Sequence, residues 1–386
     1  REMNGLREVY VLGIGQTKFA RMKGVPPNTL GIEAARAAIK DAGLADPRKL
    51  EVAYGSRSRD DTQTAENIMQ YIGVTGIEMH NTENACASGG GAVNLLWKDI
   101  AYGVHDIGIA VGCESMTAMP KGLVGVAEED LNGELGIRMP VVGAMNGLRF
   151  IHERGGTLRD LAYPSVKNHK NACGNPYAQY QKIITVEDVL NARMISDPIG
   201  VLHCCPTSDG AAAVILCTKE IAQQYTTKLV KMASSVVLTI GYESFENSIT
   251  DIPFIRDISY LAYKKAGIGP EDLDLVEMHD AFAPEELYAY EATGVCPEGE
   301  CMKFIAEGSA EIGGKCAFSP SGGLQSLGHP LGASGVRVVC EVTQHLRGEA
   351  GARQQPGARV GMAQMIGGYL TGLGCPTVGA CHILTI

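Results

Sequence analysis

Short apolar runs alternate with stretches of helical character along most of the chain. Five runs have the length and composition of buried strands, namely VYVLGIG, DIGIAVGC, AAAVILC, VVLTIGY and DLVEMHDAF. Between them lie helical stretches such as LGIEAARAAIKDAG. Because alternating strands and helices are typical of one fold class, the pattern predicts an α/β protein.

Two segments far apart in the chain share one local pattern. Residues 38–55 read AIKDAGLADPRKLEVAYG, and residues 262–280 read AYKKAGIGPEDLDLVEMHD. Each combines a helix with lysine in its last turn, an Ala-Gly stop, a loop with proline and a strand led by leucine. Chance likeness between common elements is the alternative. Each segment is, however, followed later by a run of small residues, NACASGGGAVNLL or GHPLGASGVRVV, so we expect two duplicated α/β halves.

A stretch between the halves breaks this pattern. Residues 116–199 are rich in glycine and tyrosine and lack strong strand signals. The first half then resumes at CCPTSDGAAAVILC, where turn-forming residues lead into a buried strand. We therefore expect an N-terminal half of residues 1–115 and 200–240, an inserted loop domain of residues 116–199 and a C-terminal half of residues 241–386.

Composition narrows the class of protein. The chain has 386 residues, of which 45% are hydrophobic and 20% charged, as expected for a soluble globular protein. Its net charge of -10 argues against nucleic-acid binding through bulk electrostatics. The 12 cysteines form no CxxC pair and sit in apolar surroundings, which indicates buried thiols in a reducing, cytoplasmic compartment. No apolar run is long enough to span a membrane, and the first residues lack the features of a secretory signal.

One cysteine and two histidines are candidates for chemistry. Cys86 lies in NACASGGG at a predicted helix start, where the helix dipole favours a thiolate. An isolated cysteine is more often a small core residue. His279, in VEMHDAF, ends a predicted strand, and His329, in SLGHPLGASG, lies in an irregular loop. A cysteine with a histidine is the minimal pair for nucleophilic catalysis, because the imidazole accepts the thiol proton.

With these motifs, the sequence resembles the thiolase family and is most similar to its sterol-carrier-protein-type branch. The matching segments cover nearly the whole chain and are NACASGGGA, KNHK with NPYAQYQ, CCPTSDGAAAVIL, HDAF, GHPLGASG and LRGEAGARQQPGARV. The resemblance implies two similar halves in a five-layered α/β/α/β/α arrangement with an inserted loop domain. It also implies acyltransferase chemistry with coenzyme A as a substrate and no metal.

The resemblance also implies roles for individual residues. Cys86 matches the acylated nucleophile, and His329 matches the residue that activates it and helps to bind an oxyanion. His279 matches the position that, together with His329, polarises the thioester oxygen of the second substrate. Many members have a second reactive cysteine, but the third place of HDAF is Ala281 here. Cys375 is the candidate replacement, with a loop or core cysteine as the alternative; otherwise His279 or a bound water transfers the proton.

Coenzyme A is strongly anionic, which draws attention to the basic stretch of the loop domain. Lys167 and Lys170 in KNHK are candidates to bind its phosphates, and a solvated basic surface is the equal alternative. Ser208 is expected to fix the turn before a strand, close to the path of the pantetheine arm.

The predicted reaction is cleavage or formation of a 3-oxoacyl-CoA through a cysteine thioester. The altered C-terminus favours a bulky or aromatic substrate, and the chain is similar to thiolases that act on benzoylsuccinyl-CoA, whose relatives bind a small zinc-ribbon/OB-fold protein. The plainer alternative is an acetyl-CoA acetyltransferase acting on simple acyl chains. A non-catalytic acyl-CoA-binding subunit is a further alternative, whereas HDAF before GHPLGASG disfavours a ketoacyl or hydroxymethylglutaryl-CoA synthase. The family's usual assembly implies a homodimer or homotetramer.

Overall fold

Ten strands form the main sheet of the computed structural model, which describes residues 5–58, 63–118, 134–241, 252–368 and 377–386. Five of these strands form the first half of the sheet, namely β1 (Val9–Gln16), β2 (Val52–Ser56), β3 (Glu78–Thr82), β4 (Ile107–Ser115) and β7 (Asp209–Thr218). The other five strands form the second half, namely β8 (Val230–Thr239), β9 (Leu275–Glu277), β10 (Ala317–Phe318), β11 (Val360–Gly367) and β12 (Val378–Thr385).

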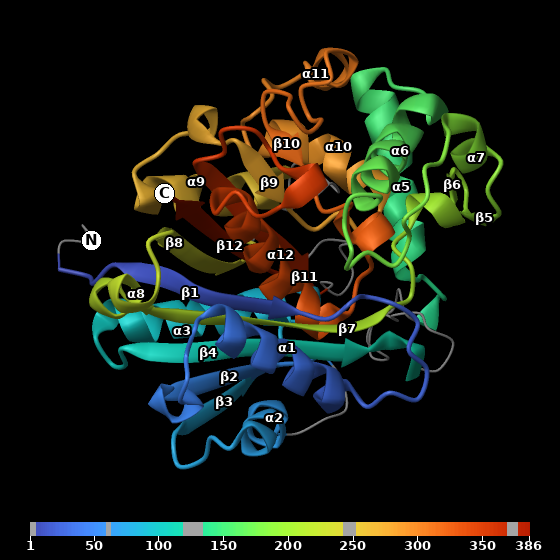
Figure 1. The fold of residues 1–386 in the computed structure, drawn as a ribbon. Helices are drawn as coiled ribbons and strands as arrows, with labels where there is room; N and C mark the ends of the chain where they lie inside the picture. Colours follow the sequence, from blue (N-terminus) through green and yellow to red (C-terminus); the bar gives the residue numbers. More distant parts are fainter. Residues whose placement is uncertain (1–4, 59–62, 119–133, 242–251, 369–376) are drawn as a thin grey trace.

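Both sets of strands have the same topology. From the outer edge inward, the first set runs β3-β2-β4-β7-β1 and the second runs β10-β9-β11-β12-β8 (Figure 1). The second strand of each set, β2 or β9, is parallel to both of its neighbours. The strand of each set that comes last in the sequence, β7 or β12, is antiparallel to both of its neighbours. The sets join where β1 pairs with β8. This shared order and direction confirm the predicted duplication.

Helices cover both outer faces and fill the space between the half-sheets. They are α1 (Pro27–Asp41), α2 (Thr64–Ile72), α3 (Ser88–Tyr102), α8 (Lys219–Tyr225), α9 (Ile252–Ala266), α10 (Ala283–Ala292), α11 (Cys301–Ala306) and α12 (Leu331–Leu346). Helices α3 and α12 pack on each other and on strands of both halves. Helices α1 and α2 cover the first half-sheet, and α9 covers the second. The predicted α/β/α/β/α layering is confirmed.

Glycine allows the two central helices to pack closely. A Cβ atom on Gly335 would lie 2.2 Å from the backbone nitrogen of Gly90, and one on Gly89 would lie 2.7 Å from that of Val336. Real Cβ atoms do not approach backbone so closely. The small residues of NACASGGG and GHPLGASG therefore bring the starts of α3 and α12 together.

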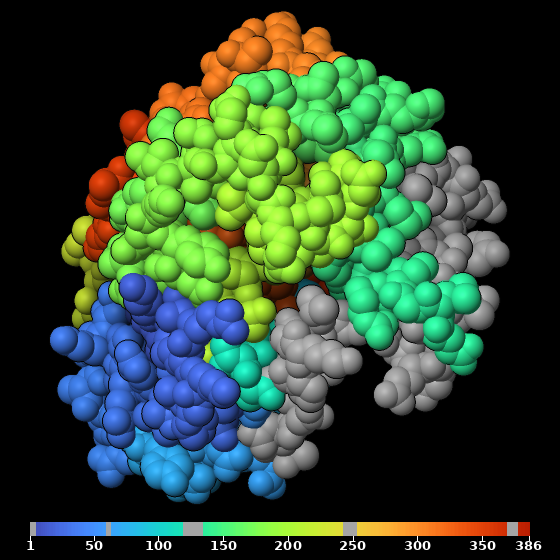
Figure 2. Space-filling view, turned by 90° about the vertical axis from the view of Figure 1, so that its right-hand side faces the viewer, coloured from blue at the N-terminus to red at the C-terminus, as the bar shows by residue number. Residues whose placement is uncertain are grey.

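Where the structure describes it, the inserted segment is mainly helical. It contains α5 (Met139–Arg154), α6 (Leu158–Ala172), α7 (Val186–Leu190) and the short strands β5 (Met194–Ser196) and β6 (Ile199–Gly200). Helices α5 and α6 pack on α10 of the second half. Figure 2 shows these residues, in green and yellow-green, above the blue N-terminal residues.

One domain boundary lies earlier than the sequence indicated. Strand β8 pairs along its length with β12 and holds the place in the second half that β1 holds in the first. The second repeat therefore begins at Val230 rather than at residue 241, because the apolar run VVLTIGY starts this half instead of ending the first.

Among the described residues, no helix has the length and apolarity that crossing a bilayer requires.

Candidate active site

Cys86 lies in a tight turn just before α3. The turn, Ala85–Ala87, is 3₁₀-helical, and Ala85 has a φ of 48°, a left-handed conformation that is rare for alanine. The Ser88 hydroxyl stabilises this turn by donating to the Ala85 carbonyl at 2.6 Å. Gly367 of β11 passes so close that a Cβ there would lie 2.7 Å from the Cys86 nitrogen. The partly exposed thiol is thus held on a constrained backbone between the two halves.

His279 follows β9 and is held by two contacts. Its backbone N–H donates to Gln364 Oε1 at 3.2 Å. Its ring Nδ1 lies 3.0 Å from a carboxylate oxygen of Glu285, a buried residue in the first turn of α10. These contacts fix the ring and leave Nε2 as its free nitrogen.

His329 lies between a π-helical turn (Gly323–Leu327) and α12. Gly328 precedes it with a φ of 117°, a conformation that favours glycine. Its ring Nδ1 lies 2.8 Å from the hydroxyl oxygen of Ser334, which itself donates to the Pro330 carbonyl at 3.0 Å. Because the Ser334 proton is used there, the hydroxyl oxygen accepts from Nδ1–H, and Nε2 carries the unshared electron pair.

These three side chains converge from both halves. The Cys86 sulfur and one ring nitrogen from each histidine all lie within 4.8 Å of one another. The imidazole centroids are 5.3 Å apart, with the rings nearly perpendicular. The Nε2 atoms of His279 and His329 are buried and make no hydrogen bond to another described residue. The structure therefore brings together the three residues that the sequence singled out.

The two histidines have opposite electrostatic surroundings. Burial lowers the pKa of His279, but Glu285 and Cys86 more than offset this, so the net pKa lies well above 6.5. Burial, His279 and Arg337 together lower the pKa of His329 well below 6.5. Near neutral pH this arrangement favours a protonated His279 beside a neutral His329.

A buried polar network links the two histidine loops. Asp280 accepts from the Leu324 backbone N–H at 2.7 Å and from the Asn168 amide at 2.8 Å. The same amide donates to Glu286 at 2.8 Å. Burial and the charge of Glu286 raise the pKa of Asp280 to about 7. The HDAF and KNHK motifs thus meet at the π-helical turn that leads to His329.

The two lysines of KNHK have different surroundings. The Lys167 side chain is fully buried, and its ammonium lies 2.8 Å from Glu286 and donates to the Phe318 carbonyl. These contacts argue against a phosphate-binding role for Lys167, because its charge is already paired away from solvent. Lys170 is exposed and pairs with Glu311 at 3.0 Å, so its role in binding phosphate stays a prediction.

Ser208 and Cys375 are the remaining predicted residues. The Ser208 hydroxyl donates to Gln179 at 2.8 Å, and a Cβ on Gly328 would lie 2.4 Å from its oxygen. Ser208 therefore supports the loop before His329. Cys375 lies outside the described residues. Cys381, the other C-terminal cysteine, is buried within β12, as expected of a core thiol.

Sequence reasoning missed Glu285 and Ser334. Both orient a histidine through Nδ1, and both lie five or six residues after it in the chain. A carboxylate in the first turn of the helix after HDAF, and a serine in GHPLGASG, were the available signals.

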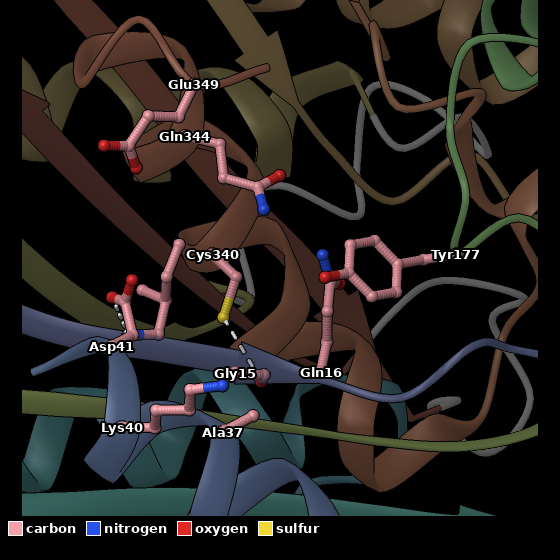
Figure 3. A pocket seen from close by; sticks show the side chains of 10 residues that line it. Gly15, Gln16, Ala37, Lys40, Asp41, Tyr177, Cys340, Gln344 and Glu349 are labelled. Carbon is pink, nitrogen blue, oxygen red and sulfur yellow. Dashed lines mark hydrogen bonds between the residues drawn. The ribbon is translucent and has the colours of Figure 1, made fainter. Parts of the chain in front are cut away.

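A separate cavity lies beside α1 and the end of α12. It measures about 490 Å³, and Figure 3 shows Lys40, Tyr177 and Gln344 around it. Its one thiol, Cys340, donates to backbone carbonyls, including that of Ala213 at 3.4 Å. None of the three converging residues lines this cavity, so it is distinct from the candidate active site.

Comparison with known proteins identifies the family. The family described as "Thiolase, N-terminal domain" matches residues 9–136, and "Thiolase C-terminal domain-like" matches residues 243–374. The benzoylsuccinyl-CoA thiolase subunit BbsB of Thauera aromatica is 37% identical over 94% of this chain and 95% of its own. The chain belongs to the thiolase family.

Other relatives of this thiolase agree with that assignment. An acetyl-CoA acetyltransferase of Methanothermobacter thermautotrophicus is 39% identical over 94% of this chain and 97% of its own. Sterol carrier protein 2 of Bos taurus is 35% identical over 93% of this chain and 70% of its own, which confirms the predicted branch. The solved structure entitled "Ltp2-ChsH2(DUF35) aldolase" has a TM-score of 0.84 and 26% identity, covering 98% of this chain and 97% of its own. The predicted thiolase fold and acyltransferase class are confirmed, and enzymes of this family use CoA-linked substrates.

Proposed function

We propose that this thiolase cleaves a bulky or aromatic 3-oxoacyl-CoA through a thioester on Cys86. The convergence of the Cys86 sulfur with two unpartnered imidazole nitrogens is the observation on which the proposal rests. His329 supplies the base, since its Nε2 is unprotonated and its Nδ1–H is bonded to Ser334. His279 supplies a donor, since Glu285 favours the protonated ring. These roles agree with those that the family resemblance implied.

The reaction proceeds in two acyl transfers. His329 takes the thiol proton, and the Cys86 sulfur attacks the 3-oxo carbon of the substrate. The bond between C2 and C3 breaks, and its electron pair moves into an enolate of the departing CoA thioester, which His279 or a bound water protonates at C2. His329 passes the first proton to the group that protonated C2. Free CoA then loses its thiol proton to the neutral His329 and attacks the acyl-enzyme, and the departing Cys86 sulfur takes that proton from His329. A fixed oxyanion donor such as His279 is worth about 3 to 4 kcal/mol of barrier.

The substrate proposal is drawn from a relative. The benzoylsuccinyl-CoA thiolase subunit matches this chain along nearly its full length. For such a substrate, attack at the ketone carbon leaves a benzoyl group on Cys86 and releases succinyl-CoA. The acetyl-CoA acetyltransferase, which is similar to the same degree, favours the alternative of a simple acyl chain.

A second subunit completes the proposal. The relative from Thauera aromatica is named as a subunit, and the solved aldolase is a complex with a DUF35 protein. We infer that this thiolase works with a small partner of the zinc-ribbon/OB-fold type. If so, the isolated chain should form the acyl-enzyme but turn over slowly until that partner is added.

Intact-protein mass spectrometry tests the proposal. The reduced chain is mixed with acetyl-, acetoacetyl-, succinyl- and benzoyl-CoA, and the adduct is located by peptide mapping. A benzoyl adduct on Cys86 that free CoA removes is the expected result. An acetyl adduct alone would move the assignment to simple acyl chains. No adduct on Cys86 from any thioester, with the thiol still open to alkylation, would refute acyl transfer.

The similarity to an aldolase complex supports one rival reaction. A retro-aldol cleavage needs a base and an oxyanion donor, but no thiol nucleophile and no free CoA. Cys86 in a constrained turn beside both histidines favours the thiolase reaction. Carbon–carbon cleavage that persists in Cys86→Ala without free CoA would establish the aldolase instead.

A further inference from the structure

The histidines of the active site have the arrangement found in zinc sites of proteins. In such sites a ligating imidazole usually donates its other N–H to a carboxylate or another oxygen, which fixes the ring. Here Nδ1 of His279 is held by Glu285 at 3.0 Å, and Nδ1 of His329 is held by the Ser334 oxygen at 2.8 Å. The two Nδ1 contacts leave both Nε2 atoms for an ion, and one ring nitrogen of each histidine lies within 4.8 Å of the Cys86 sulfur.

The distances and ligand types suit a soft divalent ion. Zinc prefers cysteine sulfur at about 2.3 Å and histidine nitrogen at about 2.0 to 2.1 Å, in a tetrahedron. The three candidate ligand atoms already lie within 4.8 Å of one another. The hard cations magnesium and calcium prefer oxygen ligands and are not expected to bind here.

The surrounding burial and charge support the same ion. His279 and His329 are 6% and 5% exposed, and their Nε2 atoms make no hydrogen bond to another described residue. A thiolate at Cys86 and the Glu285 carboxylate would face the ion with negative charge. The nearby Arg337 guanidinium is already paired with Glu277, which limits its repulsion of a cation.

We propose that Cys86, His279 and His329 form a three-ligand site for Zn²⁺, and that the bound ion excludes acyl transfer. Binding replaces the thiol proton and the Nε2 proton of His279 with bonds to zinc, and both protons are released to solvent. The sulfur electron pair that would attack a thioester is then shared with the metal. Three protein ligands leave a fourth position for water or for the thiol of free CoA. The site therefore acts as a reversible block on the nucleophile.

Cobalt spectroscopy and zinc binding test this directly. The reduced protein is freed of metal with a chelator and titrated with Co²⁺ and, separately, with Zn²⁺. One ion per chain should bind, and Co²⁺ should give a thiolate charge-transfer band in the near ultraviolet together with strong visible bands of tetrahedral geometry. Zinc should also protect Cys86 from iodoacetamide, as read by peptide mapping, and the chelator should restore alkylation.

Variants separate this site from other metal binding. Cys86→Ser should abolish the charge-transfer band and weaken zinc binding by about a hundredfold or more, and Glu285→Gln should weaken it by about 10- to 100-fold. The matched controls are Cys173→Ser, at an exposed thiol, and His80→Ala, at an exposed histidine paired with Glu78. Both controls should bind as the parent does. Circular dichroism confirms that each variant is folded.

The outcomes are independent of the proposed reaction. Unchanged zinc affinity in folded Cys86→Ser, loss of binding in His80→Ala, or a cobalt spectrum without the thiolate band would overturn the zinc site. Acylation of Cys86 in the metal-free protein is measured separately. An acyl-enzyme without zinc binding would reject only this inference, and zinc binding without acylation would reject only the proposed function.

Discussion

The two halves share one topology but use equivalent positions differently. Val52 pairs with Gly108 in the first half as Leu275 pairs with Gly361 in the second, so the register makes Ser56 the counterpart of His279. The Ser56 hydroxyl donates to a backbone carbonyl at the start of α12 at 2.8 Å. His279 instead presents a free ring nitrogen to Cys86.

The loops before the central helices differ in the same way. Cys86 precedes α3 and His329 precedes α12, so each half contributes one reactive group at the same topological point. The first half adds a thiol and uses its other loop to fix the scaffold, whereas the second half adds both imidazoles. Duplication thus brings equivalent loops of the two halves to one site, and the residues in each loop decide whether it has a structural or a catalytic role. Substitutions at paired positions should reveal that division.

The largest effect is expected from removing the thiol. Cys86→Ala should reduce acyl transfer by about 10⁴-fold or more, because the covalent route is lost. The melting temperature should change little, since the side chain is small and partly exposed. Turnover with free CoA and thermal melting are the measurements. Near-normal CoA-dependent turnover would show that the first half does not supply the nucleophile.

The paired positions Ser56 and His279 give the next largest contrast. His279→Ala should slow acyl transfer by about 10²- to 10³-fold through loss of an oxyanion donor. Ser56→Ala should leave turnover nearly intact and reduce the free energy of unfolding by about 0.5 to 1.5 kcal/mol, through loss of one hydrogen bond. Single-turnover rates and urea unfolding measure the two effects. Equal rate losses in both variants would break the proposed division.

Much of the scaffold could be predicted from local pattern. The runs VYVLGIG, DIGIAVGC and AAAVILC became β1, β4 and β7, because strongly apolar runs determine their own burial. The small-residue runs also marked the central helices. Strand β8 was assigned to the first half, although it pairs with β12 of the second, because the apolar character of a run does not determine which strand it pairs with.

The site was predictable only in part. Cys86, His279 and His329 could be named from their motifs, but Glu285 and Ser334 act through contacts that only the folded chain creates. The basic stretch KNHK gave no sign that Lys167 turns inward to Glu286. Helical spacing alone does not decide which lysine faces the core when the partner lies far away in sequence.

The contact between the two halves should be sensitive to one methyl group. Gly335→Ala would place a Cβ 2.2 Å from the Gly90 backbone, so α3 and α12 must move apart. Such overpacking typically costs about 1 to 3 kcal/mol of unfolding free energy. Gly174→Ala is the matched control, because its φ is not positive and its added Cβ would lie 3.4 Å from the nearest atom, an ordinary contact. Unchanged stability and turnover in Gly335→Ala would show that the close packing is not required.

The smallest effect, a change in pH dependence, tests the electrostatic difference between the two histidines of the second half. Glu285 helps to raise the pKa of His279, so the protonated ring persists until the pH rises through that raised value. Glu285→Gln removes the negative charge and lowers this pKa, so the alkaline fall in the acyl-transfer rate should move to lower pH. The acid limb should move less, because it reports His329, whose low pKa arises from burial, His279 and Arg337. Single-turnover rates from pH 5 to 10, measured with chelator present, decide the matter. An alkaline limb that stays in place would mean that Glu285 orients the ring without setting its charge.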